Sequence, residues 1–127
     1  MARISQLLIH AEDKPGTLAT ICSELAKVAV NISAIMAAHG PEPVIRMVAT
    51  PHSAAKKVLE ALRIPYDEED VIALRVTDRP GALGRATRKL ADAGINVDYA
   101  YGSIVKGEER ALIVMGVSDV EKAAKLV

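Results

Sequence analysis

One short turn occurs twice in this chain, at a fixed spacing. AEDKPGTL ends at Leu18 and VTDRPGAL ends at Leu83, so the aspartate, proline, glycine and leucine of the two copies lie 65 positions apart. Asn31 and Asn96 keep the same offset. A spacing that is held this far beyond the turn indicates a tandem duplication, with its seam near residues 65–70.

Both halves predict the same order of elements. Residues 3–11 and 71–77 are short, branched and apolar, which is typical of strands. After each turn, apolar residues recur at helical spacing, and two more strands and a second helix follow. The later strands are expected at residues 31–38, 44–50 and 64–70 in the first half and at residues 96–105 and 110–118 in the second.

Further signals define the helices. Thr50 before Pro51 predicts an N-cap followed by the first helical residue, and Ser118 with Glu121 matches a capping box. Apolar residues on one face of each helix should form the core. The expected inner faces contain Leu18, Ile21, Cys22, Leu25 and Val28; Ala55, Val58, Leu59 and Leu62; and Leu83, Ala86, Thr87, Leu90 and Ala93.

The order strand-helix-strand-strand-helix-strand is the ferredoxin-like pattern. We therefore expect an α+β protein with two ferredoxin-like βαββαβ units in tandem, residues 1–70 and 71–127. Their antiparallel sheets should carry helices on one face. The second half stops at Val127 in its second helix, so the last strand of that unit is missing. Whether the native chain continues past Val127 stays open.

Composition argues against several classes of function. The 16 basic and 16 acidic residues give a net charge of zero, which disfavours binding to nucleic acid or to an anionic membrane. No apolar run approaches the roughly 20 residues that cross a bilayer. The single cysteine excludes an intramolecular disulfide, and His10, His39 and His52 lack metal-ligand spacing. We expect a cytoplasmic protein without metal or cofactor, and no residue set supports an enzyme.

The repeated turn itself suggests binding chemistry. The first amides of each following helix, around Gly16 to Leu18 and Gly81 to Leu83, have no partner inside the helix and carry the positive end of its dipole. Such a place suits a carboxylate. We expect an asparagine to lie beside each turn, where its amide can bond either end of a zwitterion.

A purely structural interpretation stands beside this one. Asp-x-Pro-Gly is also ordinary turn chemistry, and Asn31 and Asn96 can simply end a helix. Either turn alone favours the structural interpretation. The paired set of aspartate, Pro-Gly and asparagine at one offset favours binding.

The motifs also resemble a known family. The segments DRPGAL and LADAGINVDYAY resemble an ACT domain, a small regulatory module of amino-acid metabolism, and DKPGTL with VAVNISAI is similar to a second copy. The whole chain resembles tandem ACT proteins. The resemblance implies amino-acid ligands at interfaces between ACT units, each held by a strand-to-helix loop and a neighbouring second strand. The implied residues are Asp13, Lys14, Pro15, Gly16, Thr17, Leu18, Asn31 and Ile32, and Asp78, Arg79, Pro80, Gly81, Ala82, Leu83, Asn96 and Val97.

Two departures separate the copies. The first has Ala29 where the second has Gly94, and alanine resists the left-handed helix end, so we expect the first helix to end differently. Ala34 stands where the second copy has Tyr99. The two pockets therefore differ in their lining, and it stays open whether both bind.

The main functional hypothesis is a non-catalytic module for allosteric regulation that senses a small amino acid. Open sheet faces and edges favour a homodimer. The alternative is a regulatory subunit that docks on an amino-acid biosynthetic enzyme such as acetolactate synthase. The sequence does not identify the amino acid.

Overall fold

The computed structural model describes residues 1–103 and 107–126. The predicted strand at 96–105 extends into residues 104–106, which lie outside the described residues. In chain order, the elements are β1 (Ala2–Ile9), α1 (Thr17–Lys27), β2 (Asn31–Ala38), β3 (Val44–Thr50), α2 (His52–Ala61), β4 (Tyr66–Thr77), α3 (Ala82–Asp92), β5 (Val97–Ser103), β6 (Arg110–Val117) and α4 (Val120–Ala124).

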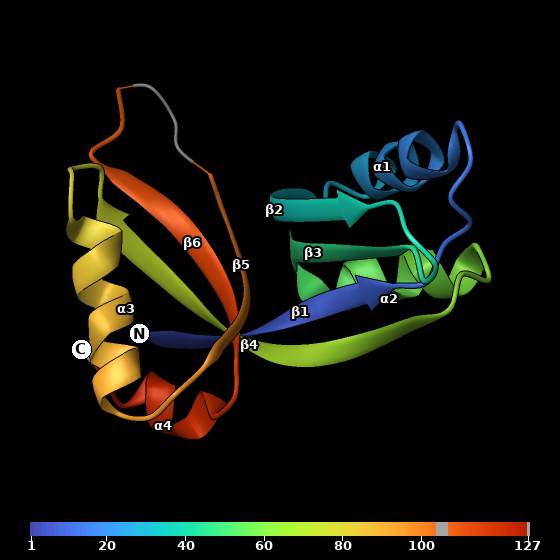
Figure 1. Cartoon of the computed structure of the whole chain (residues 1–127). Helices are drawn as coiled ribbons and strands as arrows, with labels where there is room; N and C mark the ends of the chain where they lie inside the picture. The colour runs from blue at the N-terminus through green and yellow to red at the C-terminus, as the bar shows by residue number, and fades with distance from the viewer. Residues whose placement is uncertain (104–106, 127) are drawn as a thin grey trace. The chain divides into compact units, whose positions relative to one another are not determined.

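The chain divides into two compact units. The N-unit contains Ser5–Glu69, and the C-unit contains Asp70–Val127 together with Met1–Ile4. The strand order is β2-β3-β1-β4 in the N-unit and β1-β4-β6-β5 in the C-unit (Figure 1). These orders confirm two ferredoxin-like units in tandem. The assignment of one sequence repeat each to residues 1–70 and 71–127 stays a prediction.

Residues Met1–Ile4 occupy a strand position of the C-unit. Among the described residues no strand follows α4. Met1–Ile4 instead belong to this unit, beside β4 in the strand order. Arg3 Nη2 lies 2.6 Å from Asp70 Oδ2, and the amino group of Met1 donates to the carbonyl of Leu126 over 2.6 Å.

Each unit has its own core on the helical face of its strands. In the N-unit, Leu7, Ile21, Met47, Ala55 and Leu59 are fully buried. The C-unit core holds Ile72, Leu90, Met115 and Ala123 in the same way, and Figure 1 shows α3 and α4 on one side of its strands.

The predicted helix faces are too wide at their ends. Leu18 is 38% exposed, Val28 53% and Leu83 43%. Leu18 and Leu83 lie in the first turn of their helices and Val28 at the C-cap of α1. These side chains therefore reach past the strands that cover the helix centres.

The acidic run at the seam is ordered. Residues 67–70 lie inside β4. Asp67 bonds His10 at 2.8 Å, Glu68 bonds His52 at 2.6 Å, and Glu69 accepts from buried Gln6 over 3.1 Å. Each carboxylate thus has a partner on another element, and Asp70 has Arg3. Arg3 and Gln6 lie on β1, His10 follows its end, and His52 opens α2.

Both predicted caps of the second helices are wrong. Pro51, not Thr50, is the N-cap of α2. Asp119 is the N-cap of α4, where its carboxylate accepts from the amide of Lys122 over 3.0 Å. Ser118 is unavailable for capping because its hydroxyl accepts from the amide of Asn96 over 2.9 Å.

The prediction that α1 and α3 end differently is also wrong. Ala29 has a φ of 57° and Gly94 a φ of 74°, so both lie in the left-handed region. The amide of the next residue bonds back in the same way, Val30 to Leu25 at 3.1 Å and Ile95 to Leu90 at 2.9 Å. Buried Val30 and Ile95 hold both ends in place, so packing overrides the local preference of alanine.

Candidate functional site

The two repeated turns have the same backbone. Gly16 and Gly81 are the N-caps of α1 and α3, with φ values of 92° and 88°. Thr20 N bonds Gly16 O, and Arg85 N bonds Gly81 O, both at 2.9 Å. Only glycine adopts this left-handed conformation without strain. The duplicated Pro-Gly pair therefore places each helix start at the end of its strand.

The helix-start amides are available for a ligand. Neither N-cap makes a side-chain cap bond. Within the described chain, the amides of Leu18 and Ala19 donate to no acceptor, and the same is true of Leu83 and Gly84. These groups carry the positive end of the helix dipole, so both turns retain the donors that a carboxylate needs.

The asparagines do not lie beside the turns of their own units. Asn31 opens β2 at the far end of α1 from Gly16, about 16 Å away at 1.5 Å per helical residue. The Asn96 side chain donates to Asp98 over 2.8 Å. Ile32 and Val97 pack against the two cores. The expectation that asparagine and turn meet in one corner is wrong. The helix lies between the turn at its N-terminus and the asparagine that follows its C-terminus, so the two are a helix length apart.

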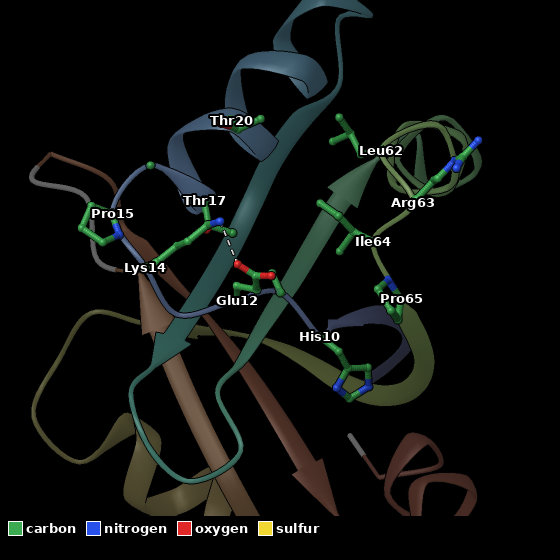
Figure 2. A pocket seen from close by; sticks show the side chains of 12 residues that line it. His10, Glu12, Lys14, Pro15, Thr17, Thr20, Leu62, Arg63, Ile64 and Pro65 are labelled. Atoms are coloured by element: carbon green, nitrogen blue, oxygen red, sulfur yellow. Dashed lines mark ion pairs between the residues drawn. The ribbon is translucent and has the colours of Figure 1, made fainter.

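A cavity of 490 Å³ lies on one side of the N-unit turn (Figure 2). Lys14, Pro15, Gly16 and Thr17 of the predicted site line it, and so do residues 10–12, Thr20 and residues 62–65. The hydroxyl oxygen of Thr17 is buried and has no hydrogen-bond partner. The loop between α2 and β4 is the wall that sequence reasoning missed.

Paired charges line this cavity. Lys14 Nζ lies 2.8 Å from Glu12 Oε2, as the dashed line in Figure 2 marks. Their hydrogen bond lowers the pKa of Glu12 and raises the pKa of Lys14. His10 is paired with Asp67.

A smaller cavity of 210 Å³ lies against the same turn. Asp13, Lys14, Thr17 and Leu18 line it together with the end of β2 at residues 37–39. The carboxylate of Asp13 contacts Nδ1 of His39. The aspartate before the turn therefore ties the turn to the loop after β2. The ferredoxin-like topology explains why the two loops are close, because β1 and β2 end at the same end of the sheet.

The C-unit turn is more closed. Its cavity measures 290 Å³, and of the predicted site residues only Ala82 lines it. A Cβ atom at Gly81 would lie 3.0 Å from Nη1 of Arg85, whereas one at Gly16 would meet nothing within 4 Å. Arg85 corresponds to Thr20 at the offset of 65. The guanidinium of Arg85 thus covers the second turn, and the first stays open.

Two other kinds of functional feature, a metal cluster and a membrane-spanning helix, are not found among the described residues. The described residues contain no group of three or more His, Cys, Asp or Glu side chains that could hold a metal ion. In the same part of the chain, no helix has both the length and the apolar character for a membrane span.

Comparison with protein families decides the relationship. A family model described as an ACT domain pair matches residues 2–127. The chain belongs to the ACT domain pair family. The resemblance of the two turn motifs to ACT domains is thereby confirmed, over nearly the whole sequence.

Several solved structures are similar to this ACT domain pair. Protein BT0572 from Bacteroides thetaiotaomicron is 26% identical, with a TM-score of 0.87 over 95% of this chain and 83% of that chain. The regulatory subunit of aspartate kinase from Thermus thermophilus is 16% identical, with a TM-score of 0.65 over 98% and 94%. Aspartokinase III from E. coli, in complex with lysine and aspartate, is 14% identical, with a TM-score of 0.56 over 97% and 30%. No curated protein matches the chain.

Proposed function

We propose that this ACT protein is a non-catalytic regulatory module that binds a small free amino acid. The observation that carries the proposal is the open cavity lined by Gly16 and Thr17, at the start of the helix whose first amides, those of Leu18 and Ala19, have no acceptor among the described residues. A ligand carboxylate on these amides would gain hydrogen bonds and a favourable dipole without displacing any protein group.

We assign the main site to the N-unit turn, Asp13 to Leu18. The larger cavity and the open space that a Cβ atom at Gly16 would meet support this choice over the turn at Asp78 to Leu83, where Arg85 covers Gly81. Binding at the second turn stays a prediction. The family-based role of Asn31, Ile32, Asn96 and Val97, and the placement of ligand at interfaces between ACT units, also stay predictions.

A similar structure with bound amino acids supports free amino acids as the ligand class. The E. coli aspartokinase III structure contains lysine and aspartate, and 30% of that chain matches the fold of this one. A ligand regulates by binding one arrangement of the protein more tightly than another, and it shifts the equilibrium only by that difference.

Isothermal titration of the chain with each of the twenty amino acids tests the proposal. We expect Gly16→Val to weaken binding at least about tenfold, because valine at a φ of 92° forces the turn and its amides to move. Gly81→Val is the matched control, since it carries the same strain at a φ of 88°. Thr17→Val removes the buried hydroxyl and should leave the fold unchanged, so a change in affinity would report on that hydroxyl.

Two results would contradict the proposal. One is a panel in which no amino acid binds. The other is an equal loss of affinity in both glycine variants, with circular dichroism showing both folded.

A second candidate is a subunit that docks on an amino-acid biosynthetic enzyme. The similarity to a regulatory subunit of aspartate kinase and the exposure of Leu18, Val28 and Ile35 favour it. Co-purification of a large catalytic subunit, with a blank amino-acid panel, would place it first. The homodimer, which light scattering tests, and the cytoplasmic location stay predictions.

A further inference from the structure

The wall opposite the N-unit turn is a fixed segment. It begins at Leu62, the C-cap of α2. The amides of Leu62, Arg63 and Ile64 bond the carbonyls of Val58, Glu60 and Leu59 at 3.0, 3.1 and 3.0 Å. At its other end, Pro65 accepts from the amide of His10 over 2.9 Å. The segment is therefore held at both ends by the backbone.

This wall presents apolar side chains to the cavity. In Figure 2, Leu62 and Ile64 lie on the side that faces α1, whereas Arg63 extends away from the cavity. Ile64 is partly buried against the N-unit core, which fixes its position. The two aliphatic groups thus lie across the cavity from Gly16, Thr17 and Thr20 at the start of α1.

The charged side chains that line the cavity are in ion pairs or, like Arg63, extend away from it (Figure 2). Lys14 is paired with Glu12 at 2.8 Å, and His10 with Asp67 at the same distance. A charged side chain would have to break one of these pairs or lie uncompensated against Leu62 and Ile64, which is costly. An aliphatic side chain would lose nothing there.

We propose that Leu62 and Ile64 determine the specificity of this site and select an amino acid with an aliphatic side chain. This inference rests on the proposed function. The volume of 490 Å³ lies within the range of roughly 300–1,000 Å³ of small-molecule pockets. Each methylene that the wall buries should raise affinity by about fourfold.

Titration calorimetry of the full chain with glycine, alanine, valine, leucine, serine, aspartate and lysine tests this inference. Affinity should rise from alanine through valine to leucine, so that leucine binds tens of times more tightly than alanine, at about fourfold per methylene. Aspartate and lysine should bind more weakly than leucine.

A pair of variants isolates the wall. Ile64→Thr and Ile64→Val introduce side chains of nearly the same shape, but only threonine brings a hydroxyl to the wall. Ile64→Thr should lower the ratio of leucine to alanine affinity by about tenfold, and Ile64→Val by about fourfold at most. Val28→Thr, at an exposed position outside the cavity, should leave the ratio unchanged. A ratio is insensitive to the fraction of folded protein, so general destabilisation does not imitate the effect.

The outcomes separate the two proposals. If amino acids bind but charged ones are preferred, or if Ile64→Thr leaves the ratio intact, the aliphatic specificity is overturned and the proposed function stands. If no amino acid binds, both are overturned.

Discussion

The ring of Tyr99 lies directly over Gly116. These residues form a cross-strand pair between β5 and β6, and a Cβ atom at Gly116 would come within 2.2 Å of Cε1 of the ring. At the corresponding pair of the N-unit, Ala34 lies opposite Val48. The large and the small side chain have changed strands between the two copies, so both pairs fill their place in the sheet.

Gly116→Val should therefore destabilise the protein by about 1–3 kcal/mol, since the new side chain collides with the Tyr99 ring. The double variant Tyr99→Ala/Gly116→Val recreates the Ala34–Val48 pair and should recover much of this loss. Urea unfolding of the single and double variants gives the coupling energy. Purely additive effects would contradict the pairing.

Gly84→Ala, where a Cβ meets nothing within 4 Å, is the control and should stabilise α3 by about 0.5–1 kcal/mol.

The matched helix ends give a second prediction. Gly94→Ala should cost about 1–2 kcal/mol, because alanine disfavours the left-handed region. Ala29→Gly should stabilise, by less than this, because glycine also gains entropy in the unfolded chain. Thermal unfolding of both variants tests the two opposite signs. A loss of stability for Ala29→Gly would show that contacts of its methyl group outweigh the backbone strain.

Tyr66 should titrate at unusually high pH. Its hydroxyl donates to Glu60 over 2.7 Å, and this bond raises the pKa of Tyr66 from 10.0 to about 12. Because the folded-state pKa is the higher one, the bond contributes stability that is fully present below pH 10 and is lost as pH rises toward 12. Ultraviolet titration of tyrosinate, with circular dichroism as the check on folding, should show a late step that Tyr66→Phe removes. Persistence of that step in the variant would refute its assignment.

Glu68 should contribute to stability at neutral pH and lose this contribution in acid. Its hydrogen bond to His52, with Lys56 at 3.3 Å, lowers the pKa of Glu68 below 4.5. A lowered folded-state pKa stabilises above the unfolded value and is lost as pH falls through the folded one. Glu68→Gln should therefore flatten the loss of stability below pH 4.5 in urea unfolding, whereas Glu42→Gln at an exposed position should not. Identical acid profiles for Glu68→Gln and the parent would oppose this role.

Sequence patterns were sufficient for the order of elements because the duplication shows each one twice. The Pro-Gly turn predicts the helix starts at Thr17 and Ala82 through local backbone geometry alone. Contacts between residues far apart in the sequence could not be predicted from these patterns. The pairs between residues 67–70 and β1 or α2 join positions separated by up to 67 residues, and no local pattern encodes them.

The candidate site shows the same division. The turn residues follow from the motif, but residues 63–65 of the wall have no counterpart at the offset of 65 within the given sequence. Comparison of the repeats therefore could not reveal it. The left-handed Ala29 was missed for a different reason, because buried Val30 imposes a conformation that alanine by itself avoids.

The membership of Met1–Ile4 in the C-unit governs how this protein can be synthesised and divided. These residues are synthesised well before Asp70, where the chain of their unit resumes, so the unit cannot form until that later part has been translated. Cutting the gene at the repeat boundary would leave residues 71–127 with an uncovered sheet edge. The two copies are consequently not interchangeable modules, and a recombination event that moves one without the first residues would deliver an incomplete fold.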